Sequence, residues 1–216
     1  MKKILHVILI SLFSLTIISC AKKSSSSSSD TTDTSTTNTT TQMGGSIQGV
    51  ELSLSTAVTT LAGTGSSGSA DNTTGTSASF NDPSGITTDG TNLYVTDSEN
   101  HLIRKIVIST GVVTTLAGTG SSGSANGTGT SASFYYPVPI TTDGTNLYVA
   151  DRNNHLIRKI VISTGVVTTV AGTGSTGSAN GTGTSASFNY PFGITTDGTN
   201  LYVSDTSNHL IRKIVL

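Results

Sequence analysis

The chain has 216 residues, of which 34% are hydrophobic and 24 are glycine, so a modest apolar core is available. Only 11% of the residues are charged, and 11 Lys and Arg nearly balance 12 Asp and Glu. This composition argues against an electrostatic nucleic-acid binder, which needs a concentrated basic face. A single cysteine and no tryptophan exclude a disulfide framework and a cysteine-based zinc site.

The first 19 residues have the features of a secretory signal peptide. Two lysines precede an apolar run over residues 4–18, which is shorter than the ~20 apolar residues that cross a bilayer. The run stops at Ile-Ile-Ser-Cys, residues 17–20, which resembles a bacterial lipobox. The resemblance implies cleavage before Cys20 and lipidation of that cysteine; an uncleaved anchor or a chance cysteine is the alternative. We therefore expect a protein secreted across the inner membrane and lipid-anchored in the cell envelope, with the side and leaflet left open.

Residues 20–53 are interpreted as the lipidated cysteine and a flexible Ser/Thr-rich stalk. Between Ser24 and Thr41, 15 of 18 residues are Ser or Thr, and none is apolar. Without apolar side chains nothing offsets the entropy of ordering the backbone. We expect the stalk to be disordered and to reach roughly 30 Å from the membrane.

Residues 54–216 contain three repeats with a period of 54. The period is set by identical residues at matching offsets, among them Phe80, Phe134, Phe188, Asp97, Asp151, Asp205, His101, His155 and His209. Such a period indicates a repeat architecture. No amphipathic helical pattern follows the signal peptide, so the repeats are predicted to be all-β.

Four strands are expected in the middle repeat, rich in Val, Ile, Thr and Tyr: Val112–Ala117, Pro139–Thr142, Asn146–Ala150 and His155–Ile162. Hairpin turns are expected around Asp143-Gly144 and Thr164-Gly165, and an irregular exposed loop over residues 118–133. The last strand carries apolar residues on both faces, which is typical of sheets covered on both sides by neighbouring blades.

Three strings resemble the signature of the NHL repeat: residues 97–106, 151–160 and 205–214, the first reading Asp-Ser-Glu-Asn-His-Leu-Ile-Arg-Lys-Ile. Around them, residues 167–172, 188–194 and 200–203 match the rest of that repeat in order. The resemblance covers residues 55 to 216 and implies a β-propeller, most often six-bladed in this family. Three repeats would give three four-stranded blades, half of a six-bladed ring.

The positions at which the first repeat begins and the last one stops predict a strand edge without a partner at each end of the repeat region. The first repeat opens on an expected outer strand, Ala57–Ala62, and the chain stops in the third strand of the last repeat. Half a ring would also leave apolar blade faces exposed, which soluble monomers avoid. We therefore expect a head-to-tail homodimer in which each chain lends its first strand to the other.

The repeated polar residues have structural and functional interpretations. His101, His155 and His209 could bind metal or act as acid–base groups, but identical placement in every blade favours a role in fixing a turn. Aspartates at 89, 143 and 197 are favoured as turn residues over calcium ligands. Arginine-lysine pairs at 104, 158 and 212 are interpreted as solvated blade edges paired with carboxylates rather than as an anion site. Glycine-rich strings such as residues 118–120 and 127–129 lack a following helix and are weak phosphate cradles.

The repeats differ most on one expected face. Between the second and third repeats, five of eight differences fall at Tyr135/Asn189, Val138/Phe192, Pro139/Gly193, Arg152/Thr206 and Asn153/Ser207. Both loops that hold these positions should emerge on the same side, opposite Asp143. Varied side chains on an unchanging frame suit a binding surface, although drift at unimportant positions is the alternative. We predict that Tyr135, Tyr136, Arg152 and Asn153 belong to a recognition face.

These observations favour a lipid-anchored, cell-envelope binding or scaffolding module that takes an extracellular protein or glycan ligand. No catalytic residue, cofactor, metal or nucleic-acid partner is predicted. Two alternatives stay open: a propeller enzyme, a lyase or hydrolase with a metal site in the channel, and a shortened repeat protein without independent function.

Overall fold

The structure, a computed structural model, describes residues 56–216. The predicted signal peptide, lipidated cysteine and stalk, residues 1–53, lie outside the described residues. Between residues 56 and 216 no helix is long and apolar enough to cross a membrane.

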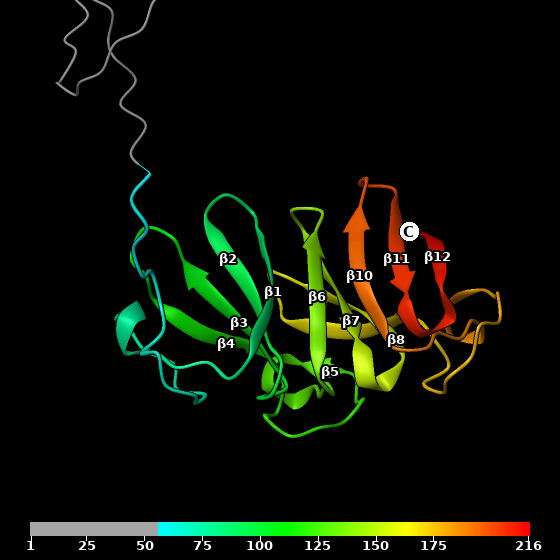
Figure 1. Ribbon diagram of the computed structural model, residues 1–216, viewed down its shortest axis with the longest axis horizontal. Coiled ribbons are helices and arrows are strands. Elements are labelled where there is room, and N and C mark those ends of the chain that lie inside the picture. The colour runs from blue at the N-terminus through cyan, green and yellow to red at the C-terminus, as the bar shows by residue number, and fades with distance from the viewer. Residues whose placement is uncertain (1–55) are drawn as a thin grey trace, which may run out of the picture. The chain divides into compact units, whose positions relative to one another are not determined.

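Residues 56–216 form three antiparallel sheets, referred to below as the first, second and third blade (Figure 1). The outer strands of the first two blades come from the repeat that follows. The first blade has the order β1-β2-β3-β4, with β1 Pro83–Thr88, β2 Asn92–Asp97, β3 Leu102–Val107 and β4 Val113–Ala117. Its consecutive strands pair with their neighbours, so every connection is a hairpin.

The second blade repeats this pattern and has an additional two-residue strand at its outer edge. Its order is β5-β9-β8-β7-β6, with β5 Gly127–Thr128, β6 Pro137–Thr142, β7 Asn146–Asp151, β8 Leu156–Val161 and β9 Val166–Ala171. The third blade has three strands, β10 Pro191–Thr196, β11 Asn200–Asp205 and β12 Leu210–Val215. Short 3-10 turns lie at Gly75–Ser77, Gly129–Ser131, Arg152–Asn154, Gly183–Ser185 and Thr206–Asn208.

The all-β fold and the blade architecture are confirmed, and the strand boundaries differ only at their ends. The first strand of the second blade begins at Pro137 rather than Pro139. The register shifts between Pro137 and Ile140, which is where Pro139, with no N–H to donate, can be accommodated. The loop over residues 118–133 is not wholly exposed, because Ala132 and Ser133 are buried at its end.

One prediction is wrong in the structure: residues 57–62 do not form a strand. The matching segments, β4 and β9, each pair with the third strand of their own blade, β3 and β8. Among the described residues no such strand precedes the first blade, so residues 58–62 have no third strand on which a ladder could form.

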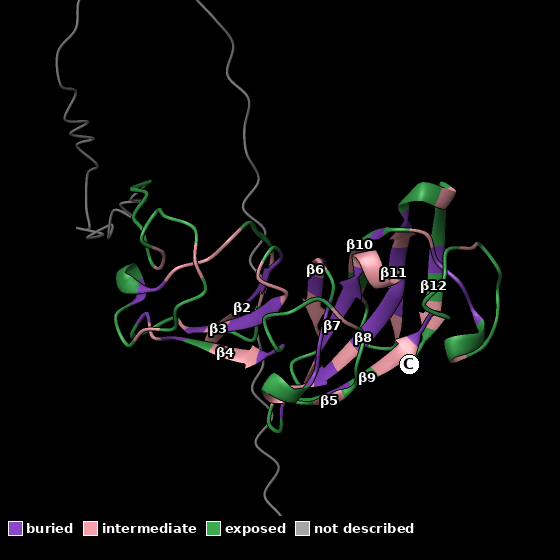
Figure 2. Cartoon of the chain, turned by 90° about the horizontal axis from the view of Figure 1, so that it is seen from below, coloured by how far each residue is buried: buried purple, intermediate pink, exposed green. Residues whose placement is uncertain are grey.

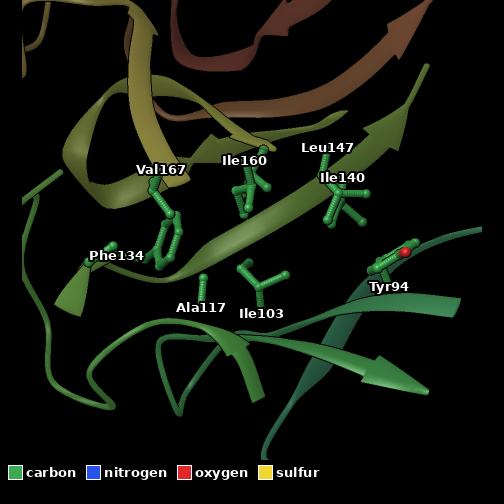
Figure 3. Close-up of a cluster of buried hydrophobic side chains, with 10 residues drawn as sticks. Tyr94, Ile103, Ala117, Phe134, Ile140, Leu147, Ile160 and Val167 are labelled. Atoms are coloured by element: carbon green, nitrogen blue, oxygen red, sulfur yellow. The ribbon is translucent and has the colours of Figure 1, made fainter. Parts of the chain in front are cut away.

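The main core lies between the first and second blades (Figure 3). Ile103 and Ala117 of the first blade face Phe134, Ile140 and Ile160 of the second, and each is at most 7% exposed. Blades therefore cover each other, which explains why the third strand of each repeat is apolar on both faces. The first strands β1, β6 and β10 lie side by side along the inner side of the arc (Figure 1).

Candidate binding face

Each blade contains a buried ion pair between the last residue of its second strand and the third residue of its third strand. In the second blade, Arg158 Nη1 donates to Asp151 Oδ2 at 2.8 Å, and neither side chain is exposed. The Arg158 guanidinium also lies over the ring of Phe134, 5.2 Å from its centroid. The same arrangement recurs as Asp97–Arg104 over Phe80 and as Asp205–Arg212 over Phe188.

The interpretation of these arginines as solvated blade edges is therefore wrong, although their pairing with carboxylates is right. Each arginine also donates to backbone carbonyl oxygens of the loop that precedes the first strand of its blade. Arg158, for example, donates to Ser133 O at 3.1 Å and to Ala125 O at 3.0 Å. The adjacent Lys159 is half-buried. These arginines are structural and are not available to an anionic partner.

The buried aspartate fixes the two loops that carry the predicted recognition residues. Asp151 Oδ1 accepts the backbone N–H of Tyr135 at 2.7 Å, and Oδ2 accepts Nδ2 of Asn154 at 2.8 Å. One carboxylate thus joins the loop before β6 to the turn between β7 and β8. The two loops lie together as predicted, because β7 brings the chain back to the end at which β6 began.

The repeated histidines fix turns and join successive blades. His101 and His155 adopt left-handed backbone conformations with φ of 57° and 56°. Nδ1 of His155 accepts the backbone N–H of Tyr190 at 3.1 Å, and His101 does the same for Tyr136 at 3.2 Å. Burial lowers the pKa of His155, and the positive charge of Arg152 lowers it further, while the negative charge of Asp205 partly opposes both. The neutral form of His155, which can accept the hydrogen bond, is therefore favoured.

Arg152 is the centre of an aromatic cluster at the seam between the second and third blades. Its guanidinium carbon lies 4.9 Å from the ring centroid of Tyr190, 5.7 Å from that of Tyr136 and 5.9 Å from that of Phe192. Its hydrogen bond within residues 56–216 is a single one, from Nη1 to Asn153 Oδ1 at 3.0 Å. Arg152 is half-buried, which strengthens the attraction between the cation and the three rings.

Tyr136 connects this cluster to the first blade. Its hydroxyl donates to Asp82 Oδ2 at 2.5 Å. This hydrogen bond, together with burial, raises the pKa of Tyr136, so the phenol stays protonated and Asp82 stays the acceptor. The ring of Tyr135 meets that of His101 edge-on, with centroids 5.6 Å apart.

The structure therefore brings Tyr136, Arg152 and Asn153 into one cluster and places Tyr135 beside it, 42% exposed. Sequence reasoning missed two members of the cluster, Tyr190 and Phe192, which are 38% and 53% exposed. Both come from the third repeat, and only the order of the blades brings them to Arg152. The difference between Val138 and Phe192 is the signal that could have identified one of them.

The opposite face carries the aspartate turns. Asp143 Oδ1 accepts the backbone N–H groups of Thr145 and Asn146 at 2.8 and 2.6 Å, and Oδ2 accepts the hydroxyl of Tyr148 at 3.0 Å. Burial acts to raise the pKa of Asp143, but these hydrogen bonds and that from the Asn146 side chain outweigh it and lower the pKa to about 2. Both carboxylate oxygens thus serve the turn. Within residues 56–216 no group of three or more His, Cys, Asp or Glu side chains could hold a metal ion.

Comparison with known proteins identifies the repeat. Residues 80–106 match the family model of the NHL repeat. Human NHL repeat-containing protein 2 is 34% identical over 172 residues, which cover 72% of this chain and 24% of the human protein. The chain thus spans about a quarter of the length of this relative.

Two solved structures share the arrangement of blades. One is an auxiliary nutrient binding protein from Bacteroides ovatus, 28% identical with a TM-score of 0.51 over 57% of this chain and 34% of that one. The other is an auxiliary nutrient binding protein from Bacteroides thetaiotaomicron, 25% identical with a TM-score of 0.53 over 59% of this chain and 36% of that one. Residues 80–106 therefore match the NHL repeat, the chain is similar to NHL repeat proteins, and its three sheets are β-propeller blades.

Proposed function

We propose that this protein is a lipid-anchored, cell-envelope binding module whose recognition face is formed by Tyr135, Tyr136, Arg152 and Asn153, with Tyr190 and Phe192. The proposal depends on one observation, which is that Arg152 lacks a carboxylate partner among the described residues. Arg104, Arg158 and Arg212 each have a buried carboxylate partner, whereas Arg152 has none among the described residues. A half-buried guanidinium without a counter-charge is suited to an anionic ligand.

The surroundings of Arg152 indicate the chemical class of that ligand. The exposed rings of Tyr190 and Phe192 flank the guanidinium and offer flat apolar surface. A carboxylate-bearing oligosaccharide combines a charge for Arg152 with ring faces that pack on aromatic side chains. Two proteins with similar blades are described as auxiliary nutrient binding proteins, which supports a binding role over a purely structural one.

The third repeat indicates suitable substitutions for the test, because it has the same fold and carries different residues at the equivalent positions. Arg152→Thr installs the residue found at position 206, and Tyr135→Asn the one found at position 189. The probe is a uronic-acid oligosaccharide, with the neutral oligosaccharide of the same length as its control, measured by titration calorimetry on the purified full chain.

We expect Arg152→Thr to weaken binding of the acidic probe about tenfold or more, since a hydrogen bond to a charged group contributes ~1.5–3 kcal/mol. Tyr135→Asn should weaken it less. Asp143→Asn, on the opposite face, should leave binding unchanged. Equal affinity for acidic and neutral probes, or loss of binding in Asp143→Asn alone, would show that the face or the ligand class is wrong.

A further inference from the structure

The sequence Val-Thr-Thr-Leu-Ala-Gly occurs twice, at residues 58–63 and 113–118, and returns with one change at residues 167–172. The second and third occurrences form the outer strands β4 and β9. The first occurrence has the same composition and no strand partner in the structure. The three segments therefore provide an internal comparison of one sequence in two environments.

The outer strand has the same pairing in both blades that possess one. In the first blade, Thr114 is paired with Lys105 and Val113 with Ile106. In the second, Thr168 is paired with Lys159 and Val167 with Ile160. Each strand also contacts the loop that carries the side-chain partner of the buried arginine: Thr115 Oγ1 donates to Asp71 at 3.1 Å, and Thr169 Oγ1 to Asn126 at 3.3 Å.

The first segment ends at the same glycine anchor but leaves Val58 and Leu61 exposed. The glycine that ends each segment is anchored in the same way, with Gly63 N donating to Gly75 O, Gly118 N to Gly129 O and Gly172 N to Gly183 O. Upstream of that anchor, Val58 is 97% exposed, whereas its counterparts Val113 and Val167 are each 1% exposed.

The third blade has the complementary defect, an uncovered third strand. Ile211 of β12 is 77% exposed, whereas its counterparts Ile103 and Ile157 are fully buried. A groove of about 610 Å³ lies along β12 and is bounded by Phe188 and Asn180. In Figure 2, β8 is largely buried and is paired with β9 along its outer edge, whereas β12 is paired with β11 on one side and has no strand on its outer side among the described residues.

We propose that residues 58–62 of one copy of this chain pair with β12 of a second copy and complete its third blade as a fourth strand. Transfer of the register of the first blade places Thr59 opposite Lys213 and Val58 opposite Ile214, with Thr60 Oγ1 donating to Asn180. Within the described residues the two segments lie at opposite ends of the arc (Figure 1), so residues 58–62 do not reach β12 of the same arc. Two copies can each give and receive one strand, which closes a head-to-tail pair.

The blade faces at the two ends support the same assembly. Between the first and second blades, Thr96 Oγ1 donates to Val138 O and Ser98 Oγ to Pro137 O, both at 2.6 Å. The third blade carries hydroxyls at the equivalent positions, Ser204 and Thr206, and the first blade of a second copy would present the matching carbonyls of Ser84 and Pro83. Each hydroxyl would then have the acceptor that its counterpart has.

The test is a cross-link between differently tagged full-length chains expressed together. One chain carries Thr59→Cys and the other Lys213→Cys, and the membranes are oxidised before electrophoresis under non-reducing conditions. We expect a dimer band that contains both tags and is lost on reduction. The matched control replaces Lys213→Cys with Lys105→Cys, because Lys105 occupies the same position in a strand that is already covered by β4.

Val58→Asp provides a second arm. In a lone chain this side chain is almost fully exposed, so the substitution leaves the blades intact, but it would bury a charge in the proposed pair. We expect it to reduce the mixed dimer at least severalfold. A mixed band no stronger than that of the Lys105→Cys control, or one unchanged by Val58→Asp, would overturn the proposal. The result does not depend on the recognition face, because none of these positions belongs to it.

Discussion

Asp151 and Arg158 form a fully buried ion pair in which the two carboxylate oxygens serve different purposes. Oδ2 accepts Nη1 of Arg158 at 2.8 Å, and Oδ1 accepts the backbone N–H of Tyr135 at 2.7 Å. The same carboxylate therefore stabilises the interior of the blade and fixes the first loop of the proposed recognition face.

Removal of one member of this pair should be strongly destabilising. Arg158→Met keeps much of the side-chain volume but leaves the Asp151 carboxylate buried without its cation, a change that costs about 3–5 kcal/mol in comparable buried pairs. Urea denaturation of the full chain, followed by tyrosine fluorescence, should show a lower midpoint. Lys159→Met, at the adjacent half-buried position, is the control and should shift the midpoint little. Equal shifts in the two variants would contradict the assignment of the pair as structural.

Gly85 allows the first and second blades to approach closely. A Cβ atom at this position would lie 2.1 Å from the backbone oxygen of Val138, which cannot move without shifting β6. We expect Gly85→Ala to destabilise the protein by ~1–3 kcal/mol through overpacking.

Gly193 is the matched control for Gly85. A Cβ atom there would lie closest to the Oγ of Ser204, at 2.5 Å, a side-chain atom that can rotate, and the Cβ of Ser204 would lie 3.3 Å away. The second repeat holds Pro139 at the same position. In a single copy of the chain, Gly193→Ala should therefore cost less, so the two variants are compared at a protein concentration at which the chain is monomeric. Comparison of the two urea midpoints checks this difference, and a larger loss for Gly193→Ala would show that the seam between blades does not limit packing.

The junction between the second and third blades should weaken in acid. The folded-state pKa of His155 is lowered, by burial first and by Arg152 second, so the unfolded chain takes up a proton at higher pH than the folded one. The contribution of this neutral histidine is fully present above the unfolded pKa of ~6.5 and falls as the pH drops from there to the lower folded pKa.

Unfolding free energies measured between pH 8 and pH 5 check this expectation. His155→Asn tolerates the left-handed backbone and cannot titrate, so its stability should fall less steeply below pH 6.5 than that of the unaltered protein. Arg152→Thr removes one of the effects that lower the pKa and should give an intermediate slope. Identical slopes in all three proteins would exclude His155 as the titrating group.

Lipidation at Cys20 can be tested in cells. Cys20→Ser removes the thiol that the resemblance to a lipobox implies is modified, so the protein should move from the membrane to the soluble fraction. Metabolic labelling with an alkyne fatty acid should be lost at the same time. Ser19→Ala, which keeps the cysteine, is the control and should retain both properties. Labelling that persists in Cys20→Ser would argue for an uncleaved anchor.

The amino-acid sequence by itself determined the period, the strands, their phase and the turns. Asp143 could be assigned to a turn because its partners, Thr145 and Asn146, are two and three residues away. Short-range hydrogen bonds of this kind depend on local spacing, which the sequence displays directly. The uncovered third strand of the last repeat also followed, because each outer strand belongs to the blade before it.

Tertiary structure alone decided which charges are buried and which side chains meet. From the sequence of its own strand, Arg158 is expected on the surface. It is enclosed because Phe134 and the carbonyl of Ser133, 24 and 25 residues earlier in the chain, pack against it. Arg152 meets Tyr190 and Phe192 only because the third blade packs beside the second. Burial depends on partners from distant parts of the chain, and a repeat pattern that is nearly the same in every blade does not show which of them will be covered.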